Sequence, residues 1–465
     1  MTYLKVGVGR SDITPAPGTP QGGWGAQTHQ RGLGADLPLY ASAIVLSDAD
    51  KSIAIIDLDH IGFESDFMRH VIDGISRLTG IPSDFVRLSY NHTHSGPNTF
   101  RMEVISEGRD MAQSYMEQLP LRIAGAVWQA QRTSVSARCG TSEGSCDIGV
   151  NRRLKLQDGR VVIGRNWDGP IDHTVRTIRF DDLQEKPIGT IVHYACHPTI
   201  MAWQNQFFTP DYPGVVRKVV EEQVGGLCLF LQGASGNIGP RRGFTGDLRV
   251  YRRLGTLLGL EAAKLAIGIE TLPRREKMTG LIESGTTIAL YEDEPIEPEY
   301  PVLDVRFRQI KLPLKPQPDY EGLEAKAVAF RLELEQTRKS GSESAIQKAT
   351  AAAVQAEHAA GHARLYAGKT HVEWPMQAIR IGSTVLLSIA GEPFIEIGQK
   401  IVEGSPFLHT CFSGYSNGGF GYIPVREAFA EGGYEVCTSI FAEDVADIVV
   451  REGLEMLRSI ADPPD

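Results

Sequence analysis

Two histidines, His92 and His94, stand on either side of one threonine in the segment YNHTHSGPNTF, residues 90–100. An apolar run, SDFVRLSY, precedes them and a Ser-Gly-Pro turn follows. This pattern predicts a strand that ends in a loop, and α/β proteins place ligand sites at such ends. Side chains alternate between the faces of a strand, so we expect both imidazoles to point the same way. The pair suits a metal ion, or one metal ligand beside a proton carrier; a plain polar loop edge is the alternative.

Two further apolar runs end in residues that bind metals. His197 stands just before Pro198 in HYACHPT, and Glu392 follows a glycine in SIAGEPF. Two neutral imidazoles and one carboxylate are a common ligand set of catalytic zinc. The sequence has no compact HExxH motif, so this set rests on three separate strand ends. We expect the other histidine of that segment, His193, to be a structural residue of the core.

A glycine-rich turn follows another apolar run in LCLFLQGASGNIGPRRG, residues 227–243. Backbone amides in such a turn can hold an anion or an oxyanion. Ser235 invites interpretation as a nucleophile, but the GxSxG pattern requires a second glycine where Asn237 stands. We therefore interpret Ser235 as a turn residue. The nearby DLDH segment places Asp57 and Asp59 on one strand face, either to orient a metal-bound histidine or to end a strand.

The elements that must position these residues can be traced from apolar periodicity. Strand-length apolar runs recur at YASAIVLSD, SIAIIDLD, FVRLSYNH, TIVHYACH, LCLFLQGA and STVLLSIAG. Helical patterns lie between several of them, as in residues 64–78 and 213–224. Strands that alternate with helices predict an α/β fold with a mixed β-sheet core flanked by helices.

One region departs from this alternation. Residues 319–368 are rich in Ala, Glu, Lys and Gln and are divided by KSGSES near Gly341, which predicts an inserted α-helical hairpin. The acidic, proline-containing segment YEDEPIEPEYP precedes it and is the best candidate boundary. Because the α/β pattern resumes afterwards, we expect the hairpin to be an insertion in a single domain over residues 1–465.

Composition limits the function. The chain has 465 residues and a net charge of −10, which argues against nucleic acid as the main partner. No window has the roughly 18 apolar residues of a membrane span, and we find no signal peptide at the N-terminus. The six cysteines are sparse and form no CxxC pair. We therefore expect a reduced, cytoplasmic protein; a Cys139–Cys146 disulfide is the alternative.

The HTHSGP, CHPT and GEPF segments, followed by the tyrosine-spaced C-terminal block GGFGYIPVREAFAEGGYEV, occur in an order that resembles the N-terminal catalytic domain of the neutral/alkaline non-lysosomal ceramidases. The resemblance covers nearly the whole chain except the helical hairpin. It implies a zinc amidase that cleaves an N-acyl bond. The zinc ligands and catalytic residues that it implies are His92, His197, Glu392 and Tyr422 for zinc, with His94 as the neighbouring active-site histidine, Tyr434 for the oxyanion and Arg152 near the polar head of the substrate.

The resemblance fails at one position. Ceramidases of this family have a GDVSP segment with an active-site serine, and a gapless match places Gly239 there. Ser235, four residues earlier, does not replace it. We therefore expect the metal site to be kept and the substrate to differ from ceramide.

The sequence thus predicts a hydrolase with one zinc ion per chain that cleaves an amide or ester bond of a small soluble substrate. Two alternatives stay open: a metal-dependent lyase, isomerase or hydrolase that acts on a sugar or polyol derivative, and a binding protein without catalysis. We expect a small molecule as the partner, no membrane span and no nucleic acid, and we leave a homo-oligomer open.

Overall fold

The computed structural model describes residues 4–99, 104–299, 301–316, 318–419 and 421–461. Its largest element is an eight-stranded sheet with the order β12-β10-β9-β6-β1-β3-β4-β5. Its strands are β1 (Leu4–Asp12), β3 (Tyr40–Ser47), β4 (Ser52–Leu58), β5 (Val86–Tyr90), β6 (Val135–Ser145), β9 (Thr174–Asp182), β10 (Pro187–Tyr194) and β12 (Leu227–Gln232). The β4–β5 and β10–β12 pairs are parallel and the other pairs are antiparallel, so the sheet is mixed as predicted.

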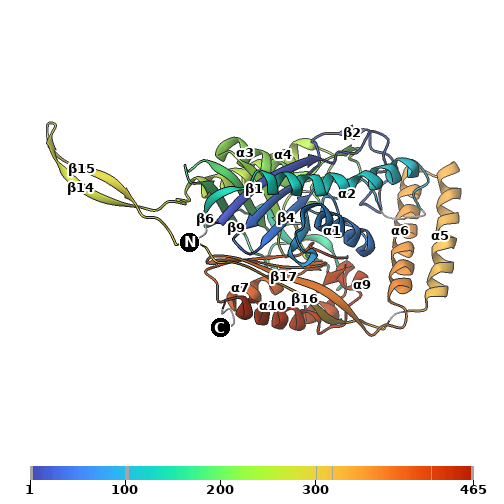
Figure 1. Ribbon diagram of the computed structural model, residues 1–465. Coiled ribbons are helices and arrows are strands. Elements are labelled where there is room, and N and C mark those ends of the chain that lie inside the picture. Colours follow the sequence, from blue (N-terminus) through green and yellow to red (C-terminus); the bar gives the residue numbers. More distant parts are fainter. Residues whose placement is uncertain (1–3, 100–103, 300, 317, 420, 462–465) are drawn as a thin grey trace.

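A second sheet lies beneath the first in Figure 1 and has the order β16-β17-β18-β20. Its strands are β16 (Leu303–Pro313), β17 (His371–Ile381), β18 (Thr384–Ile389) and β20 (His409–Ser413). Apolar residues of both sheets share one buried cluster, including Ile44, Ile191, Leu229, Ile379 and Leu386. The two sheets therefore face each other across a common core.

Helices cover the outer sides of both sheets and complete four layers (Figure 1). Those beside the larger sheet are α1 (Ser65–Thr79), α2 (Arg109–Arg132), α3 (Asp211–Val224) and α4 (Leu248–Ile267), and those beside the smaller sheet are α7 (Ile395–Glu403) and α10 (Val445–Ala461). The first helix shows why they form: Met68, Val71, Ile72 and Ile75 recur at helical spacing and are buried, and Gly80 ends the helix with a φ of 74°.

Several other elements are short. They are β2 (Gly34–Ala35), β7 (Gly149–Lys155), β8 (Val161–Asn166), β11 (Phe207–Phe208), β13 (Ile238–Pro240), β19 (Glu392–Pro393), β21 (Tyr422–Ile423), α8 (Arg426–Glu431), α9 (Tyr434–Thr438) and a 3₁₀ turn at Ser83–Phe85. The pairing of β13 with β7, and of β19 with β21, brings segments distant in sequence together.

The predicted helical hairpin is present as α5 (Tyr320–Ser340) and α6 (Glu343–Tyr366), which lie side by side at one end of the molecule (Figure 1). Alanines of α6, among them Ala353 and Ala360, are buried in the contacts of the hairpin. Ala351 of α6 lies 3.4 Å from the position that a Cβ atom on Gly25 would take. The hairpin therefore packs on the loop that includes Gly25.

A two-stranded arm, which the sequence did not predict, projects from the opposite end. It consists of β14 (Arg274–Glu283) and β15 (Thr287–Pro295), and its tip lies far from the rest of the molecule in Figure 1. The first part of the segment interpreted as a connector, Tyr291–Pro295, belongs to this arm. The segment resembles a loop in composition because β15 ends in the acidic run Glu292–Glu294 followed by Pro295.

The other expectations for secondary structure are confirmed. The six apolar runs form β3, β4, β5, β10, β12 and β18, and the two helical patterns form α1 and α3. All six cysteines are free, so the Cys139–Cys146 disulfide is absent. Within the described residues, no helix is both long and apolar enough to cross a lipid bilayer.

Candidate metal centre

The two histidines of the HTH segment lie in a loop and not on a strand. The strand β5 ends at Tyr90, and His92 has a left-handed backbone with a φ of 67°. The geometric reason given for their common direction was therefore wrong. The loop is held by backbone contacts instead: the N–H of His92 donates to the carbonyl of His60 at 3.1 Å, and Thr93 Oγ1 donates to the carbonyl of Thr209 at 2.7 Å.

His197 and Glu392 come from the other two strand ends. His197 follows β10 by three residues, and its backbone N–H donates to the carbonyl of Ile238 at 3.1 Å. Glu392 begins β19, after Gly391, whose φ of 85° turns the chain into the site. In the described residues, this places the ends of strands from both sheets at one point.

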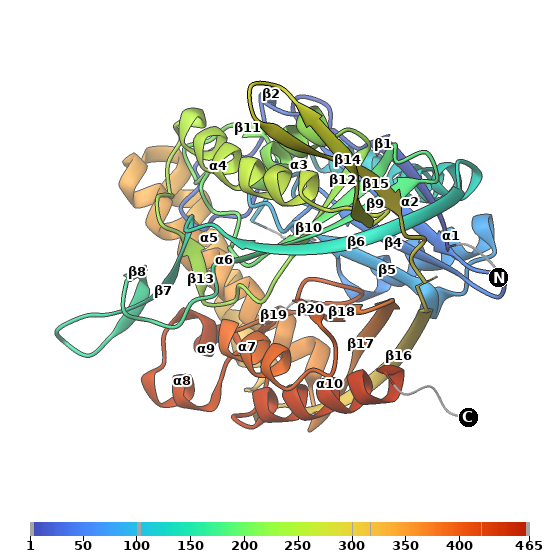
Figure 2. The ribbon, with the colours of Figure 1, turned by 90° about the vertical axis from the view of Figure 1, so that its left-hand side faces the viewer.

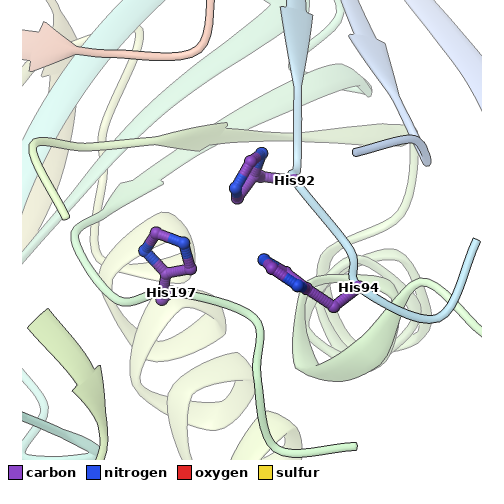
Figure 3. A group of neighbouring side chains, drawn as sticks. All are labelled: His92, His94 and His197. Atoms are coloured by element: carbon purple, nitrogen blue, oxygen red, sulfur yellow. The ribbon is translucent and has the colours of Figure 1, made fainter. Parts of the chain in front are cut away.

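Three imidazoles converge there (Figure 3). The candidate ligand atoms of His92, His94 and His197 all lie within 4.8 Å of one another. The carboxylate of Glu392 joins them, because its Oε2 lies 3.3 Å from Nε2 of His197 and 3.7 Å from Nε2 of His92. Adjacent ligands of a tetrahedral zinc ion, at about 2.0 Å from the metal, lie about 3.3 Å apart.

Backbone carbonyls fix the orientation of each ring. Nδ1 of His92 lies 2.6 Å from the carbonyl oxygen of Ile61. Nδ1 of His94 lies 3.0 Å from the carbonyl oxygen of Gly23, and Nδ1 of His197 lies 2.9 Å from that of Ser235. A carbonyl can only accept, so each Nδ1 must carry the proton and each Nε2 a lone pair. Metal-binding histidines are oriented in this way.

Three of the atoms that face the common point have no hydrogen-bond partner in the part of the chain that the structure describes. Among the described residues, Nε2 of His94, Nε2 of His197 and Oε2 of Glu392 are buried without a hydrogen bond. Buried polar atoms are normally satisfied, and leaving one unpaired costs about 1–3 kcal/mol. The donor set therefore fits a divalent metal ion, which would bind these atoms together.

Burial also sets the charge state of the site. It lowers the pKa of His92 and of His197 well below 6.5 and that of His94 to about 4, so all three rings are neutral at neutral pH. Burial raises the pKa of Glu392 to about 7, against the opposing effect of Arg152. Neutral imidazoles are the form that binds metals.

Tyr422 reaches the site through sheet pairing. Parallel pairing of β19 with β21 sets Tyr422 opposite Glu392, and the tyrosine hydroxyl hydrogen-bonds to that carboxylate. Arg152 Nη2 donates to the Tyr422 hydroxyl at 3.0 Å, and its Nε donates to Glu435 at 2.8 Å. Arg152 is thus buried in an ion pair and holds Tyr422 in place.

Tyr434 and Gly239 complete the predicted set. Tyr434 opens α9; its side chain is 42% exposed and its ring centroid lies 5.7 Å from that of Tyr422, so it stands at the edge of the site. A Cβ atom added to Gly239 would lie 3.5 Å from Cβ of Arg152, which is an ordinary contact. A side chain at position 239 would therefore fit and would face Arg152.

The sequence missed Tyr415, which is fully buried against two of the histidines. Its ring centroid lies 4.5 Å from that of His92, and its hydroxyl lies 3.3 Å from Nδ1 of His197 and 2.9 Å from Oγ of Ser235. Ser235 is therefore a buried turn residue that supports Tyr415. The left-handed φ of 54° at Tyr415 has no sequence signal, because GYSNGG reads as an ordinary turn.

An aromatic wall next to His94 was also missed. Trp24 packs on His94 with ring centroids 5.2 Å apart and meets Trp203 at 5.9 Å and Phe244 at 5.7 Å. We call Trp24, Trp203 and Phe244 the aromatic wall. These residues lie in loops that are far apart in the sequence, and so periodicity gives no sign of them.

The aspartates of DLDH do not touch a candidate ligand. Arg217 of α3 donates to Asp57 at 2.6 Å and to Asp59 at 2.5 and 2.6 Å, and all three side chains are buried. Asn91 donates to Asp59 at 2.5 Å. The ion pairs therefore anchor the loop before His92 and orient the histidines only indirectly.

Comparison with known proteins gives the family. Residues 3–233 match the model described as neutral/alkaline non-lysosomal ceramidase, N-terminal. The chain belongs to this ceramidase family. It is 26% identical over 267 residues to the neutral ceramidase of Drosophila melanogaster, covering 53% of this chain and 38% of that protein. It is 22% identical over 484 residues to the neutral ceramidase of Pseudomonas aeruginosa, covering 94% of this chain and 69% of that protein.

Solved structures agree on the fold of this ceramidase-family chain. The crystal structure of the Pseudomonas aeruginosa neutral ceramidase superimposes with a TM-score of 0.68 at 20% identity, over 99% of this chain and 75% of the other. A ceramidase complexed with C2 gives a TM-score of 0.69 at 18% identity. The α/β fold is therefore the ceramidase fold, while this chain spans only 38% of the length of the Drosophila relative.

Proposed function

We propose that the chain is a zinc-dependent hydrolase that cleaves an amide or ester bond of a small soluble acyl compound. The convergence of His92, His197 and Glu392 carries the proposal, because three buried ligand atoms are oriented toward one point. Tyr422 is the fourth ligand in this proposal. A zinc ion held there would supply a nucleophilic water at neutral pH and polarise the acyl carbonyl.

The residues around the ligands then have distinct tasks. His94, whose Nε2 has no hydrogen-bond partner among the described residues, would accept the proton that the nucleophile loses and pass it on. Tyr434 at the edge of the site would donate a hydrogen bond from its hydroxyl to the developing oxyanion, a role worth about 3 kcal/mol. Arg152 and Glu435 keep Tyr422 in position through their buried ion pair.

The substrate in this proposal is not ceramide. Gly239 replaces the serine expected from the family motif, so the neighbourhood of Arg152 lacks a hydroxyl at that position. The aromatic wall beside His94 gives the substrate a flat apolar surface, which suits an acyl chain or a sugar face. Because Nε1 of Trp24 is buried without a partner among the described residues, a sugar derivative is the second candidate substrate.

Metal content and product analysis test the proposal together. Purified wild type should contain about one zinc ion per chain, and His197→Ala should contain none. His193→Gln is the matched control, because His193 is a buried histidine of the same segment that bonds only the carbonyl of Phe412. Metal-free wild type would overturn the zinc assignment.

Activity should be screened on N-acyl amino acids, N-acyl sugars, simple esters and a short-chain ceramide. We expect hydrolysis of a soluble substrate to yield two fragments, with a new acid and a new amine or alcohol. His94→Gln should keep the zinc ion and lose turnover, which separates a proton carrier from a ligand. A product of unchanged mass would favour an isomerase, and loss of water would favour a lyase.

A further inference from the structure

The arm, residues Arg274–Pro295, exposes apolar side chains on both of its faces. The exposed fractions are 52% for Met278, 63% for Leu281, 50% for Ile282, 43% for Ile288, 44% for Leu290 and 59% for Tyr291. The strand register puts Ile282, Ile288 and Leu290 on one face, and Met278, Leu281 and Tyr291 on the other. Strands with apolar side chains on both faces are normally packed against other protein surfaces on both faces.

Such an arm is not stabilised by its own contacts. Within the described chain, β14 pairs only with β15, and an isolated two-stranded hairpin is marginally stable in water. Its base is nevertheless fastened to the body, since Arg274 pairs with Glu185 at 2.6 Å and Arg138 pairs with Glu297 at 2.9 Å. The body therefore holds the arm out, where it can reach another molecule (Figure 1).

The outer side of α4 offers a surface of matching character. Leu257, Leu260 and Ile267 recur at helical spacing and are 41%, 51% and 59% exposed. We call these three residues the α4 stripe. Four basic residues and one acidic residue accompany the stripe on α4: Arg249, Arg252, Arg253, Lys264 and Glu261. An exposed apolar row on a helix of this kind marks an interaction surface.

The arm and α4 are complementary in length and in charge. Ten residues of β14 extend about 33 Å. Twenty residues of α4 extend about 30 Å. The arm has five acidic and three basic residues, whereas α4 has one acidic and four basic residues. Counted over these residues alone, the arm is negative and α4 is positive, although ion pairs of Arg249 with Asp247, Arg252 with Asp36 and Lys264 with Glu261 reduce the charge that α4 offers to a partner.

We propose that two copies of this chain form a dimer in which the arm of each copy lies on the α4 stripe of the other. The chain supplies both complementary surfaces, and a two-fold axis would satisfy both arms at once. Each arm has ten residues in β14 and nine in β15. Together with the α4 stripe, this reaches the roughly 20–30 residues that each partner of a stable interface contributes.

Sedimentation velocity at micromolar concentration tests the dimer with three pairs of changes. Leu281→Glu with Ile282→Glu puts a charge on each arm face, and Leu260→Glu with Ile267→Glu does so on the α4 stripe. The control is Leu332→Glu with Leu365→Glu on the helical hairpin, where the exposed fractions of 54% and 60% are similar. All six side chains are exposed, so thermal unfolding of the body should hardly change.

We expect wild type and the control to be dimers. The arm pair and the stripe pair should each weaken dimerisation at least about 30-fold, as loss of a central apolar contact does. A shortened arm, in which a Gly-Ser turn joins the cross-strand neighbours Arg274 and Pro295, should be monomeric. It keeps the base and removes the exposed strands.

Each contrary result would overturn one part of the dimer proposal. Monomeric wild type rejects the dimer, and a dimer that survives loss of the arm rejects the arm as its contact. If the arm pair dissociates the dimer but the stripe pair does not, the arm binds elsewhere and the assignment to α4 is wrong. Dissociation by the control pair would place the contact on the hairpin.

Discussion

The candidate metal centre and the arm both depart from the usual pattern of buried apolar and exposed polar groups, each in the opposite way. At the metal centre, polar atoms of His94, His197 and Glu392 are buried without a partner among the described residues. In the arm, Leu281 and Ile282 are at least half exposed. Buried polar atoms and exposed apolar side chains are each costly, because water stabilises the first group and destabilises the second.

The difference between the two regions lies in how firmly the chain holds them. Buried hydrogen bonds from every side fix the metal centre, as in the contacts of Nδ1 of His92 and His197 with carbonyls. The arm is fixed only at its base. We infer that the centre is shaped in advance for a small ion, whereas the arm gains its order from a larger surface.

Removal of a bound zinc ion should give an effect as large as any and should act on only one region. At a free zinc concentration about a thousand times its Kd, binding adds about 4 kcal/mol to the free energy of unfolding. Urea unfolding with and without a chelator measures this difference. The shortened-arm variant should lose the same amount, and Glu392→Gln should lose much less. Equal unfolding curves with and without chelator would contradict the metal centre.

Breaking one ion pair in each region should separate a buried from an exposed charge. Glu435 is 1% exposed and accepts from Arg152 at 2.8 Å and from Arg153 at 3.1 Å. Glu435→Ala leaves buried guanidinium groups without their carboxylate, so the free energy of unfolding should fall by about 3–5 kcal/mol.

The matched change in the arm is Glu294→Ala, which removes exposed pairs with Arg275 and Lys277. The free energy of unfolding of the monomer, measured at protein concentrations low enough for dimers to dissociate, should not change. Similar losses from both substitutions would show that burial does not distinguish the regions.

Acid should destabilise the core behind the metal centre. Burial lowers the pKa of His193 from 6.5 to about 3, so the unfolded chain binds a proton there throughout this interval and the folded chain does not. The free energy of unfolding should therefore decrease by about 1.4 kcal/mol per pH unit from this residue as pH falls from 6 to 4. His193→Gln, which can still donate to Phe412, should reduce the slope by that amount.

Urea unfolding at several pH values measures this slope. The control is His371→Gln, since His371 is exposed on β17. An unchanged slope in His193→Gln would mean that the buried ring does not resist protonation.

Gly239→Ser should have the smallest effect on the fold. The added Cβ meets Arg152 at 3.5 Å, so we expect a stability change within about 1 kcal/mol and unchanged zinc content. If the missing hydroxyl excludes ceramide, this variant should hydrolyse a short-chain ceramide faster than wild type does. A stable, zinc-loaded variant with no gain would place the specificity elsewhere, with the aromatic wall as the next region to change.

Sequence periodicity predicted the strands that lead to the centre because each is a compact apolar run. The histidines and Glu392 could be expected at the ends of these runs, and the family resemblance added Tyr422. The left-handed turns at His92 and Tyr415 could not be predicted, because neither residue type signals a positive φ. The aromatic wall could not be predicted either, because tertiary packing brings its residues together from separate loops.

The arm escaped prediction for a related reason. Its strands combine apolar and charged residues around a bulge between Met278 and Gly280, so strict alternation is lost. The single-domain organisation over residues 1–465 remains a prediction. The zinc ligands, the catalytic roles of His94, Tyr434 and Arg152, and a cytoplasmic location likewise await experiment.

The order of the proposed ligands along the chain has a consequence for biosynthesis. His92 and Tyr422 are 330 positions apart, so at about 5–20 residues per second their synthesis is separated by roughly 15 to 65 s. The strands of the larger sheet end at Gln232, whereas Glu392 and Tyr422 come after most of the second sheet has been made. A nascent chain therefore presents the three imidazoles before the carboxylate and the tyrosine, so a metal ion that needs the whole proposed set would be captured tightly only late in synthesis.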